Sequence, residues 1–163
     1  MTGLHTAYLT GRQMRVWDLM RDGLSQSDIA RELDISRQAV NQLVQTIPEK
    51  ITAALYDAAK LNGVEPRNVD SSHGILLGWS RDFETEAVIT VSTETGLRVW
   101  YRHNLGKCKI CPDRRRCTSA LLRSVDALGV SLTPQERGLD PSKLSSLIFS
   151  RVLGPDDKKN PHR

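Results

Sequence analysis

No run of apolar residues in this 163-residue chain is long enough to cross a lipid bilayer. The N-terminus also lacks the charged-then-apolar pattern of a secretory signal, so we expect a cytoplasmic protein. Cysteine is scarce: there are three, all within ten positions, which argues against a disulfide framework. No nucleophile–base pair and no paired acids are legible, so we do not expect an enzyme.

The positive charge of the chain is unevenly placed. The length fits one large domain or two small ones, and the net charge is +4. Residues 1–62 hold seven basic and seven acidic side chains, residues 63–106 carry a net charge of −2, and residues 107–163 carry +6. Such a balance is compatible with nucleic-acid binding, but a neutral DNA-binding head needs added attraction for phosphate, either from dimerisation or from the basic C-terminal part.

Residues 24–45 have the pattern of a helix-turn-helix. Ser25 and Ser36 are N-cap residue types, and each precedes a short helical pattern. Ile29 and Leu33 share one face of the first helix, while Val40, Leu43 and Val44 give the second helix a buried stripe. The three residues at 33–35 make a turn so tight that the helices must cross steeply, which lets the second enter a DNA major groove.

The other face of the second helix is rich in side-chain amides. The candidate DNA-binding residues are Ser36, Arg37, Gln38, Asn41, Gln42 and Gln45. Arginine pairs with guanine, and asparagine and glutamine pair with adenine, through two hydrogen bonds each. A solvated helix face would more commonly carry Glu and Lys, so this face favours recognition of double-stranded DNA.

The same stretch resembles helix-turn-helix transcription regulators, especially the archaeal Tfx-type and sigma-region-4-like groups. The residues that carry the resemblance are Leu9-Thr10-Gly11-Arg12-Gln13 and Gly23-Leu24-Ser25-Gln26-Ser27-Asp28-Ile29-Ala30. Asp34 stands where such turns often have Gly, and Asp tolerates the left-handed conformation. The resemblance implies control of transcription and ends near residue 62.

Helices flank the motif on both sides. We expect a lead-in helix over residues 10–22, and another over residues 49–62 that begins after Pro48. The apolar stripe of the latter, Ile51, Ala54, Leu55, Ala58 and Leu61, could pack on the DNA-binding head or pair with a second copy. We favour pairing and therefore a homodimer, since such proteins usually bind DNA as dimers.

The fold class we expect is α+β. Residues 63–73 have the composition of a linker, and residues 74–79, 86–93 and 97–103 predict a three-stranded antiparallel sheet. Helices are predicted over residues 118–128 and from Pro141 onward. The predicted domains are a helix-turn-helix domain (1–47), a connecting helix (48–63), a metal-binding α+β domain (64–153) and a disordered tail (154–163).

The three cysteines have the spacing of metal ligands. Cys108, Cys111 and Cys117 follow the pattern C-x2-C-P-x4-C, and His103 is the best fourth ligand in the chain. The pattern resembles the [4Fe–4S] loop of the endonuclease III family, except that Tyr101 stands in place of the leading cysteine. Part of it also resembles iron–sulfur regulators of the WhiB type. We favour an iron–sulfur cluster, and zinc is the alternative.

Basic residues lie in and beside the same loop. Lys107, Lys109, Arg114, Arg115 and Arg116 are candidate phosphate contacts. The hypothesis is a transcription regulator whose metal centre senses redox state or a ligand and changes DNA affinity. A constitutive DNA-binding protein with a structural zinc site is the first alternative. A thiol–disulfide oxidoreductase is the second, although the βαβ context of thioredoxin-like motifs is missing.

Overall fold

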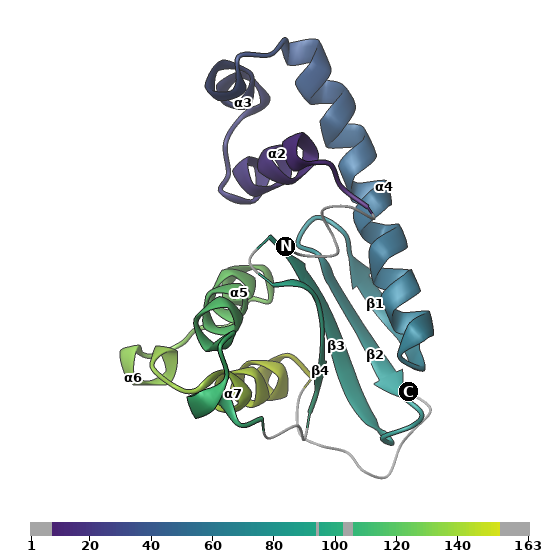
Figure 1. The fold of residues 1–163 in the computed structure, drawn as a ribbon, viewed down its shortest axis with the longest axis vertical. Coiled ribbons are helices and arrows are strands. Elements are labelled where there is room, and N and C mark those ends of the chain that lie inside the picture. The colour runs from purple at the N-terminus through teal and green to yellow at the C-terminus, as the bar shows by residue number, and fades with distance from the viewer. Residues whose placement is uncertain (1–7, 94, 103–105, 154–163) are drawn as a thin grey trace. The chain divides into compact units, whose positions relative to one another are not determined.

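The computed structural model describes residues 8–93, 95–102 and 106–153. The chain divides into two compact units, residues 1–99 and residues 100–163. Figure 1 shows the elements of both. No helix in the described ranges has the length and apolar character to span a membrane. The predicted disordered tail, residues 154–163, lies outside the described residues.

Three helices open the first unit: α2 (Gly11–Arg21), α3 (Gln26–Leu33) and α4 (Arg37–Leu61). The lead-in helix α2 begins as predicted, with a capping box in which the Thr10 hydroxyl accepts from the Gln13 N–H and the Gln13 side chain accepts from the Thr10 N–H. Val16, Trp17 and Leu19 are buried on its inner face. The lead-in helix is therefore part of the core and not an appendage.

The helix α4 runs through Pro48 without a break, so the predicted start of a new helix at this residue is wrong. Proline has no N–H to donate to the carbonyl of Val44, which normally ends a helix. Here Ile47 and Ile51, on either side of Pro48, are both fully buried. Packing of these two side chains keeps the segments collinear and outweighs the lost hydrogen bond.

The sheet has four antiparallel strands in the order β1-β2-β3-β4, not the predicted three. The strands are β1 (Val64–Asp70), β2 (Ile75–Ser80), β3 (Thr85–Ser92) and β4 (Gly96–Tyr101). The additional strand is β1, in the segment predicted to be a linker. It is an edge strand with four exposed residues, and an edge position tolerates Pro66. The polar composition of β1 is the reason why the sequence predicted a linker there.

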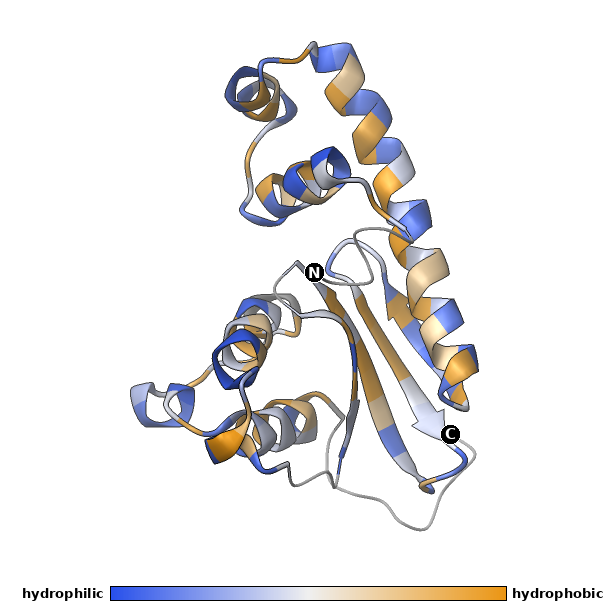
Figure 2. Cartoon of the chain, in the orientation of Figure 1, coloured by the Kyte–Doolittle hydropathy of each residue, from blue (hydrophilic) through white to orange (hydrophobic). Residues whose placement is uncertain are grey.

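The C-terminal half of α4 lies along the sheet and contacts β1, β2 and β3 (Figure 1). The side chains that were predicted to pair with a second copy are buried inside this unit: Ile51, Ala54 and Leu55 are fully buried, and Ala58 is 6% exposed. Only Leu61 of that stripe is exposed. Pairing through this stripe is therefore wrong, because the sheet already covers it. In Figure 2 hydrophobic colour follows most of β3 and the first half of β2.

The second unit contains a short 3-10 helix, η1 (Cys108–Ile110), and the helices α5 (Arg114–Ala127), α6 (Pro134–Arg137) and α7 (Pro141–Leu153). The predicted start at Pro141 is confirmed, whereas α5 begins four residues before the predicted position. The helices α5 and α7 pack together, with Leu121 and Val125 of α5 and Leu144 and Ile148 of α7 buried. Trp100 and Phe149 are also in ring contact, with centroids 6.2 Å apart.

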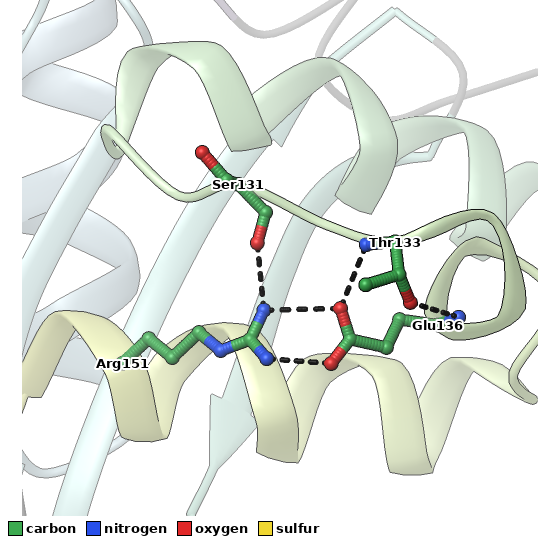
Figure 3. Close-up of polar contacts among 4 residues, drawn as sticks. All are labelled: Ser131, Thr133, Glu136 and Arg151. Atoms are coloured by element: carbon green, nitrogen blue, oxygen red, sulfur yellow. Dashed lines mark hydrogen bonds and ion pairs between the residues drawn. The ribbon is translucent and has the colours of Figure 1, made fainter.

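A polar clamp joins α6 to α7 (Figure 3). One guanidinium nitrogen of Arg151 donates to the Ser131 carbonyl at 2.7 Å, and the two terminal nitrogens together meet the Glu136 carboxylate. Glu136 also accepts from the Thr133 N–H at 2.8 Å in a capping box. The hydrogen bond from Arg151, followed by that from the Thr133 backbone, lowers the pKa of Glu136 to about 2. The clamp fixes a four-residue helix that could not be stable alone.

Candidate nucleic-acid interface

The turn between α3 and α4 has the geometry that the sequence predicted. Asp34 adopts the left-handed conformation, with φ 51° and ψ 50°. The N–H of Ile35 donates to the Ala30 carbonyl at 3.1 Å, which closes the end of α3. After Ser36, which is the N-cap, the chain begins α4 at Arg37. Aspartate thus does in this turn what glycine does more commonly.

Serine caps fix the start of both motif helices. The Ser25 hydroxyl accepts from the Asp28 N–H at 3.2 Å, and the Ser36 hydroxyl accepts from the Ala39 N–H at 3.1 Å. The Ser25 hydroxyl also donates to the Asp28 carboxylate, and this contact lowers the pKa of Asp28. Ser36 is therefore a cap in this structure, in addition to being a candidate DNA contact.

The first turns of α4 present one apolar and one polar face. Val40 and Ile47 of α4 and Ile29 of α3 are fully buried, and the two helices pack together. Leu43 and Val44, which were predicted to be buried with Val40, are only half-buried. The five candidate base-contacting side chains are all exposed: Arg37, Gln38, Asn41, Gln42 and Gln45. A helix held from behind, with a row of amides in front, can place those amides against the edges of bases.

The two compact units differ sharply in charge. Residues 1–99 hold ten basic and thirteen acidic side chains, a net charge of −3. Residues 100–163 hold thirteen basic and six acidic side chains, a net charge of +7. The unit that carries the helix-turn-helix is thus slightly acidic, and the phosphate backbone would be attracted by the other unit.

The basic loop of the second unit is exposed along most of its length. The side chains of Lys107, Lys109, Arg114, Arg115 and Arg116 are all exposed. Arg114 pairs with Asp140 at 2.7 Å, and Arg116 lies 3.9 Å from Asp113. No ion pair of Arg115 is found among the described residues. Its guanidinium is the best placed of the three arginines for a new partner such as a phosphate.

The cysteines lie at the start of the helical part of the second unit. Cys108 begins η1, Cys111 follows it, and Cys117 lies in the first turn of α5. The Ser142 N–H at the start of α7 donates to the sulfur of Cys108 at 3.3 Å. Such a backbone donor suits a thiolate, but within the described ranges no three His, Cys, Asp or Glu side chains gather where they could hold a metal ion. His103 lies outside the described residues.

The helical part and its exposed α4 face define a helix-turn-helix DNA-binding domain. Residues 7–56 match the family model of bacterial regulatory proteins of the luxR family, a class of DNA-binding transcription regulators. No curated protein and no solved structure matches the chain. The match covers the lead-in helix and the helix-turn-helix, and it does not extend to the sheet or to the cysteines. Resemblance to the Tfx-type group and to iron–sulfur loops stays a prediction.

The contacts that link the lead-in helix α2 to α4 and to the sheet were not predicted from the sequence. Gln13 accepts from the Lys50 ammonium at 3.2 Å, which links α2 to α4. Thr93 donates to Asp18 at 3.1 Å, which links α2 to the end of β3. The residues that form these links are common surface types, and only the long α4 and the four-stranded sheet bring them together. The sequence offered one signal of the long helix: apolar residues continue at helical spacing on both sides of Pro48.

Proposed function

We propose that this protein is a cytoplasmic transcription regulator that recognises its operator through the recognition segment of α4, residues 37–47. The side chains of Arg37, Gln38, Asn41, Gln42 and Gln45 contact base edges in the major groove. Their exposure on a helix whose opposite side is anchored by the fully buried Val40 and Ile47 carries the proposal. The luxR-family match over residues 7–56 supports the same assignment.

The proposal is tested by binding to duplexes that differ only in sequence. A duplex selected by the wild-type protein from a random pool is compared with a scrambled duplex of equal length and composition. Replacing Gln38, Asn41 and Gln42 together with alanine should abolish the preference, since each paired contact is worth about 1–3 kcal/mol of discrimination. Gln135→Ala, in the exposed helix α6, is the matched control. Equal preference in the triple variant and the control would refute the assignment.

The second unit acts in this proposal as a phosphate-binding element. Its net charge of +7 and the exposed loop with Lys107, Lys109 and Arg114–Arg116 support that role. A DNA-binding head on a unit with a net charge of −3 needs such a contribution. Two copies of the protein on one operator would double this attraction for phosphate, and a homodimer remains part of the proposal.

The cysteines are proposed to bind a metal centre that holds the basic loop. The support is the chemistry of the ligands: three thiols at C-x2-C-x5-C spacing, one of which already accepts a backbone hydrogen bond. The ligands are not gathered among the described residues, so their convergence would have to accompany metal binding. We favour an iron–sulfur cluster over zinc, and redox sensing is the corresponding regulatory hypothesis.

Metal content separates these alternatives. Protein prepared without oxygen is analysed for iron, sulfide and zinc, with the variant carrying serine at Cys108, Cys111 and Cys117 as the control. Iron with sulfide favours a cluster, and stoichiometric zinc favours a structural site. Absence of both from the wild type, or equal amounts in both proteins, would refute a metal centre. Sensing would be refuted if the serine variant bound the selected duplex as the wild type does, with and without oxidant.

A further inference from the structure

The recognition segment is one end of a helix whose other end belongs to the sheet. The helix α4 has 25 residues, and its second half is buried against β1, β2 and β3. A continuous helix transmits a rotation or tilt at one end to the other, because each residue is fixed to the next by the same hydrogen-bond ladder. The direction in which the amides face therefore depends on how the sheet holds residues 51–59.

The weakest point of this helix is braced by the turn between β1 and β2. Pro48 removes one hydrogen bond from the ladder, one turn before Thr52. The Thr52 hydroxyl donates to the Pro48 carbonyl at 2.8 Å and also contacts the hydroxyl of Ser71 in that turn. The brace is thus applied just after the position where the helix would bend most easily.

The same turn also supports the lead-in helix. Trp17 of α2 is 1% exposed, and its indole N–H donates to the Ser72 carbonyl at 3.4 Å. Gly74 lies directly against the indole: a Cβ atom there would be 2.9 Å from two carbons of the ring. Gly74 has φ +69°, and its carbonyl accepts from the Val91 N–H at 2.8 Å, so the sheet holds it in place. The turn at residues 71–74 contacts α2 and α4 together.

We infer that this turn is a positioning element for DNA recognition, with Trp17, Ser71 and Gly74 as positioning residues. It fixes the recognition segment relative to the lead-in helix, so that all the amides meet their bases in one register. The inference rests on the proposed function and deepens it. It assigns to the sheet the role of orienting the helix-turn-helix. The phosphate contacts depend less on that orientation than the base contacts do.

The test compares substitutions at two glycines with similar positive φ angles, +69° and +65°. Gly74→Ala forces a methyl group against the Trp17 ring and within 3.0 Å of the Val91 carbonyl oxygen, whereas Gly129→Ala places it in open space. With the full chain, we expect Gly74→Ala to lower the ratio of affinities for the selected and scrambled duplexes about tenfold, the value of one well-made base contact. Affinity for the scrambled duplex should stay within about twofold, because phosphate attraction supplies it. Gly129→Ala should leave the ratio unchanged.

A second pair of variants is used if circular dichroism shows that Gly74→Ala has lost helix content. Ser71→Ala removes the hydroxyl that contacts Thr52, and Ser72→Ala removes the exposed hydroxyl next to it. We expect only Ser71→Ala to lower the ratio, by about threefold to tenfold, as for the loss of one hydrogen bond. Equal ratios within each folded pair would overturn the inference. A wild-type protein that selects no sequence would instead refute the proposed function itself.

Discussion

Single residues decide how the helix-turn-helix forms and which side chains it exposes. Asp34 takes the left-handed position in the turn, and Ser25 and Ser36 cap the helices on either side. These features were predictable, because each depends on a local conformational preference of one residue type. The exposure of the amide face was predictable as well, since it follows from the helical period of the buried side chains.

Asn41 is expected to specify one base pair. Asn41→Ala should relax the preference at a single position of the selected duplex, where adenine is favoured, and leave the other positions unchanged. Affinity for the original duplex should fall by about tenfold to a hundredfold. Binding to duplexes substituted one base pair at a time measures this. A uniform loss across all positions would show that Asn41 contacts only the backbone.

Glu136 is expected to make the second unit sensitive to acid. Its pKa in the folded protein, about 2, is lower than its ordinary value of 4.5, so its contribution to stability is complete above pH 4.5 and is lost as the pH falls toward 2. The difference in thermal midpoint between the wild type and Glu136→Gln should therefore shrink over that range. Glu49→Gln, an exposed carboxylate of α4, is the control. A constant difference across the range would contradict the clamp.

At the scale of elements, the sequence was most informative where local signals act alone. The starts of α2, α3 and α7 were evident from the sequence, whereas β1 and the continuity of α4 were not. The exposed polar residues of β1 resemble those of a linker, and it becomes a strand only by pairing with β2. In the sequence, a proline inside a helix looks the same as a proline at the first position of a helix. Only the burial of Ile47 and Ile51 on either side shows that Pro48 lies inside one.

Pro48→Ala is expected to stabilise the first unit. Alanine restores the missing N–H and removes a residue that costs about 3 kcal/mol relative to alanine in a helix interior. The thermal midpoint should rise by several degrees, measured by circular dichroism. Pro134→Ala, at the first position of α6, should produce no such gain, because proline is favoured there. A lower midpoint for Pro48→Ala would mean that the proline ring itself is needed for packing.

At the scale of the whole molecule, the helix-turn-helix and most of the net positive charge belong to different compact units. The charge distribution along the sequence already indicated this division. With the boundary between the two units known, the net charges are −3 for residues 1–99 and +7 for residues 100–163. The arrangement of the metal ligands was less predictable. Spacing identifies thiols that could converge, but their convergence depends on metal binding and on His103, which lies outside the described residues.

Arg115 is expected to contribute to the salt dependence of DNA binding. Arg115→Gln should reduce the slope of the logarithm of affinity against the logarithm of salt concentration by about 0.9, the value for one phosphate contact on duplex DNA. The reduction should be the same for selected and scrambled duplexes. Arg137→Gln, in the exposed helix α6, is the control. An unchanged slope in Arg115→Gln would remove the basic loop from the interface.

The most direct test is sequence selection from a random pool of duplexes. Wild-type protein and the variant with alanine at Gln38, Asn41 and Gln42 are carried through identical rounds, and the bound duplexes are sequenced. Recognition by α4 predicts that the wild type enriches a defined motif and that the variant retains DNA but enriches none, since its phosphate contacts are intact. Enrichment of the same motif by both proteins, or of no motif by the wild type, would contradict base recognition through α4.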